Sequence, residues 1–250
     1  MDRRRALALM GSGLASMAAT PALAQAPVIK LPGDITSGEA ATVLAVRTPS
    51  PAVALTFDDG PHPRLTPYLL DLLKAHRMVA TFYVLGDRVK RYPGIVQRML
   101  AEGHEVGNHS WSHPVLARMG DGAMLRELDA TTRAVYQVTG KVPVTMRPPY
   151  GAMTSRQRLL VHDARKLPTV LWSVDPQDWR RPGSHIVTRR MLAGARPGAI
   201  ILAHDIHTPT AQAMPAVLQG LRHRGLTSVT ISQLLGWPRW QDRRFRLKAA

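Results

Sequence analysis

Between residues 53 and 235, short apolar runs alternate with segments of helical periodicity, and this alternation restricts the folds open to the chain. The apolar runs lie at 53–57, 79–84, 104–107, 143–146, 169–172, 199–202 and 227–230. The helical segments lie at 65–75, 93–101, 123–138, 155–164, 184–195, 211–224 and 232–235. Strands that are apolar on both faces are typical of parallel sheets covered by helices. The pattern therefore favours an α/β fold in which about seven parallel strands close into a barrel, over an open sheet.

Chain length and residue types limit the domain count and the chemistry. With 250 residues, 45% of them hydrophobic, the chain can bury one sizeable core, so we expect a single domain. It contains no cysteine, which excludes disulfides, thiolate zinc sites and cysteine nucleophiles. Any metal must therefore be held by imidazole and carboxylate groups.

The N-terminus has the order of an export signal: a basic start, an apolar stretch over residues 6–19 and then small residues. We predict a signal peptide at residues 1–24, cleaved after Ala24 or Ala26, and therefore a periplasmic or secreted protein. The apolar stretch is short and contains two glycines, which disfavours a permanent membrane span. The paired arginines fit twin-arginine export, and the general secretory route stays open beside it.

Three further segments are expected after the signal. Residues 25–50 carry Pro, Gly, Thr and Ser without sustained periodicity, which is typical of a linker or N-terminal arm. The folded domain is predicted over residues 51–240. Residues 241–250 are expected to form a basic tail.

The chain is strongly basic, with a formal net charge of +16 at pH 7. Such a charge raises the local concentration of polyanions near the surface, including anionic envelope polymers. Nucleic acid is not an expected partner, because export removes the chain from it and the aromatic residues do not interleave with basic runs. General solubility is the alternative explanation of the charge.

Five short polar signatures lie at or just after the ends of the apolar runs. They are Thr-Phe-Asp-Asp-Gly at 56–60, His-Ser-Trp-Ser-His at 109–113, Arg-Pro-Pro-Tyr-Gly at 147–151, Asp-Pro-Gln-Asp-Trp at 175–179 and Leu-Ala-His at 202–204. In parallel barrels the chemistry lies at the carboxyl ends of the strands. Together the signatures supply metal ligands, a base and an acid for the hydrolysis of an acyl group.

Two pairs of side chains in these signatures point to a metal. Asp58 and Asp59 follow a strand and precede a turn, so both can face one cleft, one as a metal ligand and the other as a general base. A structural cap for the next helix is the alternative for this pair. His109 and His113 are four residues apart, which on a helical turn places both imidazoles on one side. One Asp and two His leave coordination positions open, and imidazole ligands favour zinc or a neighbouring transition metal over magnesium.

With these motifs the chain resembles the polysaccharide deacetylase family, the nodulation-protein-B-like, family 4 carbohydrate esterases. The resemblance covers residues 51–240 and rests on Thr-Phe-Asp-Asp-Gly, His-Ser-x-x-His, Arg-Pro-Pro-Tyr-Gly, Asp-x-x-Asp-Trp and Leu-x-His. It implies that this segment is a catalytic domain with a distorted barrel of strands and helices. It also implies removal of N-linked or O-linked acetyl groups from sugars.

The resemblance assigns a role to each matching residue. It makes Asp58 the general base and Arg147 the residue that orients this base. It makes Asp59, His109 and His113 the ligands of one divalent metal, with Zn²⁺ as the first choice and Co²⁺ or another transition metal open.

The remaining matches complete the site that the resemblance implies. Tyr150 matches the substrate-binding residue whose backbone N–H stabilises the oxyanion of the reaction. His204 matches the general acid, and Asp178 matches the carboxylate that tunes it. Trp179 and Leu202 match the apolar pocket for the acetyl methyl group. Four polar residues near the motifs have no matching role, and we expect them to serve loops and packing: Asp175, His62, His104 and His207.

The sequence therefore predicts an exported, metal-dependent hydrolase that releases acetate from the N-acetylated amino sugars of a glycan, such as peptidoglycan or a chitin-like oligosaccharide. An esterase that removes O-acetyl groups from xylan or another glycan is the alternative within enzymes. A carbohydrate-binding protein that has kept the fold and lost turnover is the alternative outside them.

Overall fold

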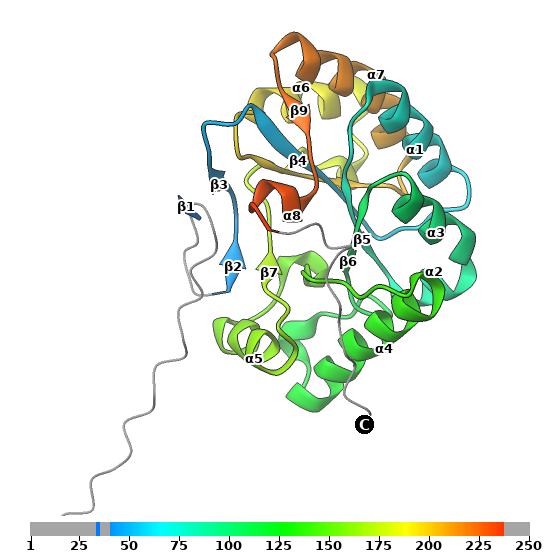
Figure 1. Ribbon diagram of the computed structural model, residues 1–250, viewed down its shortest axis with the longest axis vertical. Helices are drawn as coiled ribbons and strands as arrows, with labels where there is room; N and C mark the ends of the chain where they lie inside the picture. Colours follow the sequence, from blue (N-terminus) through cyan, green and yellow to red (C-terminus); the bar gives the residue numbers. More distant parts are fainter. Residues whose placement is uncertain (1–33, 36–40, 238–250) are drawn as a thin grey trace, which may run out of the picture.

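The computed structural model describes residues 34–35 and 41–237, in which strands and helices alternate (Figure 1). The strands are β1 (Asp34–Ile35), β2 (Thr42–Val43), β3 (Val46–Arg47), β4 (Ala52–Asp58), β5 (Thr81–Val84), β6 (Glu105–Asn108), β7 (Thr169–Val170), β8 (Ile200–His204) and β9 (Thr227–Ser228). The α-helices are α1 (Leu65–His76), α2 (Gly86–Arg91), α3 (Pro93–Ala101), α4 (Asp121–Thr139), α5 (Ser155–Arg165), α6 (Ser184–Gly194), α7 (Thr208–His223) and α8 (Ile231–Leu234). Three short 3-10 helices are η1 (Leu116–Arg118), η2 (Pro149–Gly151) and η3 (Asp178–Arg180).

Parallel pairing joins the strands in the order β6-β5-β4-β8, with β9 beside the start of β4. Single bridges continue this arrangement: Asn108 pairs with Met146, and Met146 pairs with Thr169 of β7. The segment that begins with β7 then reaches β8, where Val174 pairs with Ile201. The pairs thus run around a ring that is closed by single bridges at Met146 and Val174. Each predicted apolar run takes part in a parallel pair, which confirms the α/β fold and explains why the barrel is distorted.

Helices cover the outside of the strands (Figure 1). Helix α7 packs between α1 and α6, and α4 packs against α2 and α3. Each predicted helical segment is found, with ends that shift by at most a few residues. Helix α2 and the 3-10 helices were not predicted, because six or three residues are too few to show a helical period.

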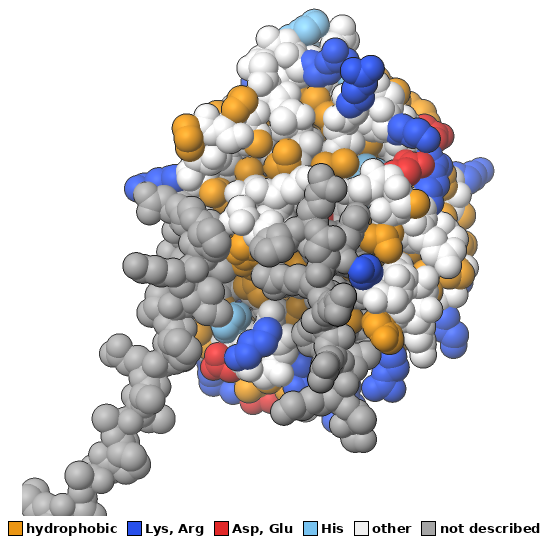
Figure 2. Space-filling model, viewed as in Figure 1, with side chains coloured by type: hydrophobic (Ala, Val, Ile, Leu, Met, Phe, Trp, Pro, Cys, Tyr) orange, Lys and Arg blue, Asp and Glu red, His pale blue; other side chains and the backbone are white. Residues whose placement is uncertain are grey.

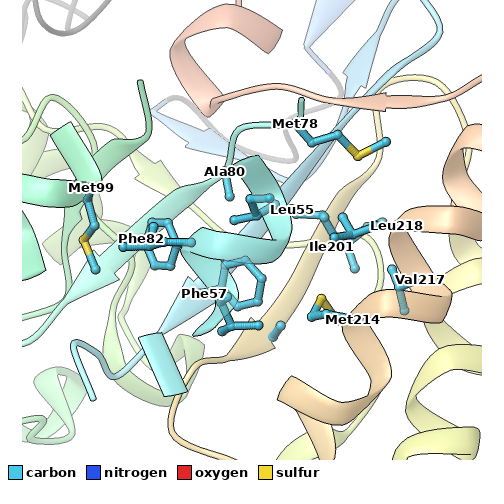
Figure 3. Packing of buried hydrophobic residues seen from close by; sticks show 14 of the residues in the cluster. Leu55, Phe57, Met78, Ala80, Phe82, Met99, Ile201, Met214, Val217 and Leu218 are labelled. Carbon is cyan, nitrogen blue, oxygen red and sulfur yellow. The ribbon is translucent and has the colours of Figure 1, made fainter. Parts of the chain in front are cut away.

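Alternation of side chains along β4 determines which residues reach the site. Leu55 and Phe57 belong to the core between strands and helices, where Phe57 stacks on Phe82 with 5.2 Å between ring centroids (Figure 3). Burying each such side chain contributes about 1.5–3 kcal/mol. Ala54 belongs to a second cluster that includes residues of α8 and lies inside the barrel. Because side chains two residues apart share a face, Asp58 lies on the inner face with Ala54.

The folded domain includes residues before residue 51, where the sequence predicts it to start. Within the predicted arm, β2 pairs in parallel with β7, and β1 pairs antiparallel with β3. Val43 and Val46 of this segment are buried in the core. The segment shows no periodicity because each of its strands contains two residues, although its strand β2 pairs with β7.

Two predicted segments lie outside the described residues, namely the signal peptide at 1–24 and the basic tail at 241–250. Within the described part of the chain, no helix combines the length and the apolar character needed to cross a bilayer. Lys and Arg side chains are spread over the face drawn in Figure 2, with few Asp or Glu side chains between them. This distribution agrees with the net charge of +16.

Candidate active site

A cavity of about 420 Å³ opens at the carboxyl ends of the strands. Its wall contains eight of the residues predicted for the site: Asp58, Asp59, His109, His113, Tyr150, Trp179, Leu202 and His204. The other two predicted residues, Arg147 and Asp178, are fully buried and contact Asp58 and His204. The fold therefore brings all the predicted site residues into one assembly.

Three of these residues place possible ligand atoms around one point. One atom each from Asp59, His109 and His113 lies within 4.8 Å of the other two. The Nε2 atoms of His109 and His113 lie 3.3 Å and 3.1 Å from Asp59 Oδ1. Asp59 follows β4 directly and His109 follows β6 directly, so the carboxyl ends of two strands on either side of β5 supply the cluster.

The four-residue spacing of the two histidines predicts a helical turn, and this prediction is wrong. Residues 109–113 belong to no helix, and Ser110 and His113 have φ angles of 70° and 65°. A right-handed helix needs φ near −60°, so this segment is a loop with two left-handed residues. The loop still brings the imidazoles of His109 and His113 together, with 5.2 Å between their ring centroids.

The donor atoms of the cluster fit a divalent transition metal. His109 Nδ1 lies 2.7 Å from the backbone carbonyl oxygen of Arg147, which can only accept, so Nδ1 carries a proton and Nε2 is the ring nitrogen that faces Asp59. Asp59 Oδ1 is buried, and no described group makes a well-aligned hydrogen bond to it. Burial alone would raise the pKa of Asp59, but the imidazoles of His109 and His113 hold it far below its usual range. An ionised carboxylate that faces two imidazole nitrogens is a donor set suited to zinc and its neighbours.

Asp58 is held by a fully buried arginine. Arg147 Nη1 donates to Asp58 Oδ1 at 2.7 Å and lies 2.8 Å from Thr56 Oγ1. The other guanidinium nitrogens donate to the backbone carbonyls of Val170 and Leu171 at 3.0 Å and 2.9 Å. With its donors fixed in this way, the guanidinium is a rigid counterion that leaves Asp58 Oδ2 free to face the cavity.

His204 is held by a buried carboxylate. One oxygen of Asp178 accepts the backbone N–H of His204 and the other lies against Nδ1, both at 2.8 Å. Thr210 donates to the same carboxylate at 2.7 Å. Burial lowers the pKa of His204, but the hydrogen bond and charge of Asp178, with smaller effects of Asp58 and Asp59, raise it to about 9. Because a carboxylate only accepts, Nδ1 carries a proton and Nε2 is the ring nitrogen left for a ligand.

Aromatic side chains form the rim of the cavity. Tyr150 has a φ of 60°, is 66% exposed, and packs against the ring of His113 with 4.5 Å between centroids. Trp179 is 48% exposed, whereas Leu202 is buried. Trp172 also lines the cavity, although its role was not predicted from the sequence. The rim can thus contact the apolar faces of a ligand, and Leu202 offers a buried surface for a small apolar group.

Two residues with predicted loop or packing roles lie in the cavity wall, Asp175 and His207. Asp175 Oδ1 accepts the backbone N–H of Gln177 at 2.7 Å, so this side chain also shapes its own turn. The ring of His207 lies 5.6 Å from that of His204, and its pKa is lowered by burial and then by the charge of His204. The position of His207 three residues after His204 was the available sequence signal.

His62 and His104 have the loop and packing contacts that the sequence predicts. His62 Nδ1 accepts the backbone N–H groups of Arg64 and Leu65 at 3.2 Å and 3.1 Å. His104 Nδ1 accepts the backbone N–H of Ala80 at 3.1 Å, and burial lowers the pKa of His104 to about 4. Neither histidine lines the cavity.

The sequence is similar to a known protein family and to several of its members. The family model described as polysaccharide deacetylase matches residues 45–167. Peptidoglycan-N-acetylglucosamine deacetylase PgdA of Listeria monocytogenes is 47% identical over 184 residues, which cover 74% of this chain and 39% of that protein. The chitooligosaccharide deacetylase of Bradyrhizobium sp. is 40% identical over 199 residues, covering 73% of this chain and 90% of that protein.

The structure is also similar to a solved structure of a deacetylase. Peptidoglycan deacetylase PdaC from Bacillus subtilis superposes with a TM-score of 0.70 at 41% identity, covering 74% of this chain and 91% of that chain. The chain therefore belongs to the polysaccharide deacetylase family, which confirms the resemblance seen in the motifs. It spans about two fifths of the length of the Listeria relative.

Proposed function

We propose that the protein is a metal-dependent hydrolase that removes N-acetyl groups from the amino sugars of a glycan, either peptidoglycan or a chitin-like oligosaccharide. The observation that carries the proposal is the placement of two buried charge pairs, Asp58 with Arg147 and His204 with Asp178, at a cavity that also holds one carboxylate and two imidazoles. Relatives that are named as deacetylases of peptidoglycan and of chitooligosaccharides support this substrate class. The cavity volume of about 420 Å³ also suits a small-ligand site.

The proposed metal site consists of Asp59, His109 and His113, whose donor atoms fit a transition metal. Zn²⁺ is the proposed ion because imidazole nitrogen and carboxylate oxygen suit it, and Co²⁺ or another transition metal fits the same set. When bound, such an ion supplies Lewis-acid activation of the acyl carbonyl and of the attacking water.

Asp58 is the proposed general base of the hydrolysis. Its Oδ2 faces His109 Nε2 at 3.8 Å, while its Oδ1 is held by Arg147, so one carboxylate oxygen is fixed and the other is available to a water in the cavity. The carboxylate would remove a proton from that water as it attacks the acyl carbon. Arg147 would keep the carboxylate in place without contacting the substrate.

His204 is the proposed general acid. Its pKa of about 9 keeps the imidazole protonated near neutral pH, with Asp178 holding the proton on Nδ1. Nε2 would then donate its proton to the amine nitrogen as the carbon–nitrogen bond breaks. The products are acetate and a free amine on the sugar.

The rim residues are proposed to hold the substrate. The backbone N–H of Tyr150 would donate to the oxygen that becomes negative during the attack. Trp179 and Leu202 would contact the acetyl methyl group, and the exposed rings of Tyr150 and Trp179 would pack against sugar.

We further propose export through the signal peptide at residues 1–24 to the periplasm or the exterior. There the basic surface would favour anionic envelope polymers as a partner of the domain. N-terminal sequencing of the mature protein checks the first step, with a start after Ala24 or Ala26 as the expected result.

Acetate release from acetylated chitin oligomers, peptidoglycan and acetylated xylan tests the proposed activity. Release from the N-acetylated substrates supports the proposal. Release from xylan alone would instead assign an O-acetyl esterase. Glycan binding without release from any substrate would assign a carbohydrate-binding protein.

A further inference from the structure

The loop that carries the two histidines of the proposed metal site does not hold its shape through regular secondary structure. Residues 109–113 belong to no helix or strand. Ser110 and His113 have positive φ, a conformation that costs free energy for residues other than glycine. A loop of this kind keeps one conformation only where surrounding contacts compensate for that cost.

One carboxylate on helix α4 supplies the largest set of these contacts. Glu127 Oε2 accepts the backbone N–H groups of Trp111 and Ser112, both at 2.9 Å. Glu127 Oε1 accepts the hydroxyl of Ser112 at 3.0 Å. All three bonds fall on the two residues in the middle of the loop, between His109 and His113.

The contacts of Glu127 are with the loop and not with a cation. Among the described residues, no Lys, Arg or His makes an ion pair with Glu127. Its negative charge is therefore met by two amide dipoles and a hydroxyl, and hydrogen bonds to an ionised acceptor are roughly twice as strong as neutral ones.

Helix α4 is itself fixed to the strand that precedes the loop. Asn108, the last residue of β6, donates to the backbone carbonyl of Leu128 at 2.8 Å and to Thr132 Oγ1 at 3.0 Å. The side-chain oxygen of Asn108 accepts the backbone N–H of Ser110 at 2.9 Å. These hydrogen bonds fix helix α4 relative to β6 at a point next to the loop. Glu127 is therefore carried by a helix that is already held in place there.

Close packing holds the same loop on its other side. A methyl group at Gly86 would lie 2.3 Å from a ring atom of Trp111. The absence of a side chain at Gly86 therefore allows the ring to pack directly against the start of α2. The loop is thus pressed between α2 and α4, and its backbone donors point toward Glu127.

We infer that Glu127 is a positioning residue for the metal site: it fixes residues 111–112 so that His109 and His113 present their Nε2 atoms to the same point as Asp59. The inference rests on the proposed metal site. Groups that orient metal ligands typically change metal affinity by about 10- to 100-fold when removed.

Zinc affinity of the metal-free protein, measured by competition with a chromophoric chelator, tests the inference. Glu127→Ala should weaken zinc binding by about 10- to 100-fold. Glu127→Gln, which keeps one oxygen for the two backbone donors and loses the charge, should give a smaller loss. Asp129→Ala is the matched control, because it removes an acid from the same helix and breaks an ion pair with Arg165 that does not touch the loop. Its zinc affinity should equal that of the wild type.

Thermal unfolding of the metal-free variants separates positioning from general stability. The inference expects the two alanine variants to have similar midpoints while their zinc affinities differ. Equal zinc affinity in Glu127→Ala and the wild type would overturn the role of Glu127 and leave the proposed function standing. Equal losses in Glu127→Ala and Asp129→Ala would overturn it in the same way. Absence of zinc binding by the wild type would overturn the metal site together with this inference.

Discussion

Asp58 and His204 lie opposite each other in the parallel pairing of β4 with β8, at the carboxyl end of each strand. Register partners in a sheet point to the same face, so both side chains reach the cavity although they are far apart in the sequence. Each is held from behind by a buried group of opposite charge, Arg147 for Asp58 and Asp178 for His204. Adjacent strands thereby present a carboxylate and a protonated imidazole to one ligand.

The first prediction concerns the alkaline limb of the pH–rate profile. Asp178 is the main group that raises the pKa of His204 to about 9, and burial opposes it. Asp178→Asn should lower the pKa of His204, so the general acid loses its proton at lower pH and the alkaline limb moves down by about 1–3 pH units. The profile of kcat/KM on an N-acetylated oligomer, at fixed metal content, measures this shift. An unmoved limb, together with wild-type turnover in His204→Ala, would show that another group protonates the amine.

The second prediction concerns the metal ligands. His109→Ala combined with His113→Ala removes both imidazoles and leaves Asp59 as the one remaining proposed ligand, and a single carboxylate ligand cannot retain a transition metal tightly. Elemental analysis should find less than stoichiometric metal, and acetate release should fall with it. Stoichiometric metal in the double variant would contradict the assignment.

The third prediction concerns stability in mild acid. Folded His104 has a pKa of about 4, against 6.5 for an ordinary histidine, so the unfolded state binds more protons between these pH values. The free energy of unfolding should therefore fall as the pH falls from 6.5 toward 4, with a contribution from this residue on the order of 3 kcal/mol. In His104→Gln this contribution is absent, and urea unfolding at pH 7 and pH 5 should show a smaller loss than in the wild type. Identical losses in both proteins would exclude His104 as the source.

The fourth prediction concerns the basic surface. Exposed charges attract an anionic polymer through a field that salt screens, with a Debye length of about 10 Å at 0.1 M ionic strength. KM for an anionic polymeric substrate should therefore rise with salt, while turnover of a short neutral oligosaccharide should change little. Initial rates across a salt series with both substrates provide the comparison. Equal salt sensitivity would remove the net charge of +16 from the account of substrate capture.

Much of the fold could be predicted from the sequence because its main strands are apolar on both faces and helices such as α4 and α7 are long enough to show a helical period. The strand at β4 and the helix α3 have nearly the predicted ends. The arm around β2 and β3 could not be predicted, because two-residue strands carry no period and their pairing with β7 is set by tertiary contacts.

The candidate site also has features that could be predicted from the sequence and features that could not. Polar residues at strand ends are visible in the sequence, and parallel strands bring their carboxyl ends to one edge, so Asp58, His109 and His204 could be placed together. The conformation between His109 and His113 could not be predicted, because spacing does not reveal positive φ. Glu127 was also missed, because it accepts backbone N–H groups of the loop. Almost every residue has such a group, so the residue types do not reveal the contact.

Acetate release by zinc-loaded Asp58→Asn, with metal content measured in the same sample, tests most sharply whether Asp58 is the base of a metal-dependent hydrolysis. The amide keeps the shape of the side chain and an acceptor for Arg147, and it removes the proposed base while Asp59 and the two imidazoles stay in place. If Asp58 is the base, the variant should keep its full metal content while turnover of N-acetylated oligomers falls by about 10²- to 10⁴-fold relative to the wild type. Wild-type turnover in the metal-loaded variant would show that Asp58 is not the base.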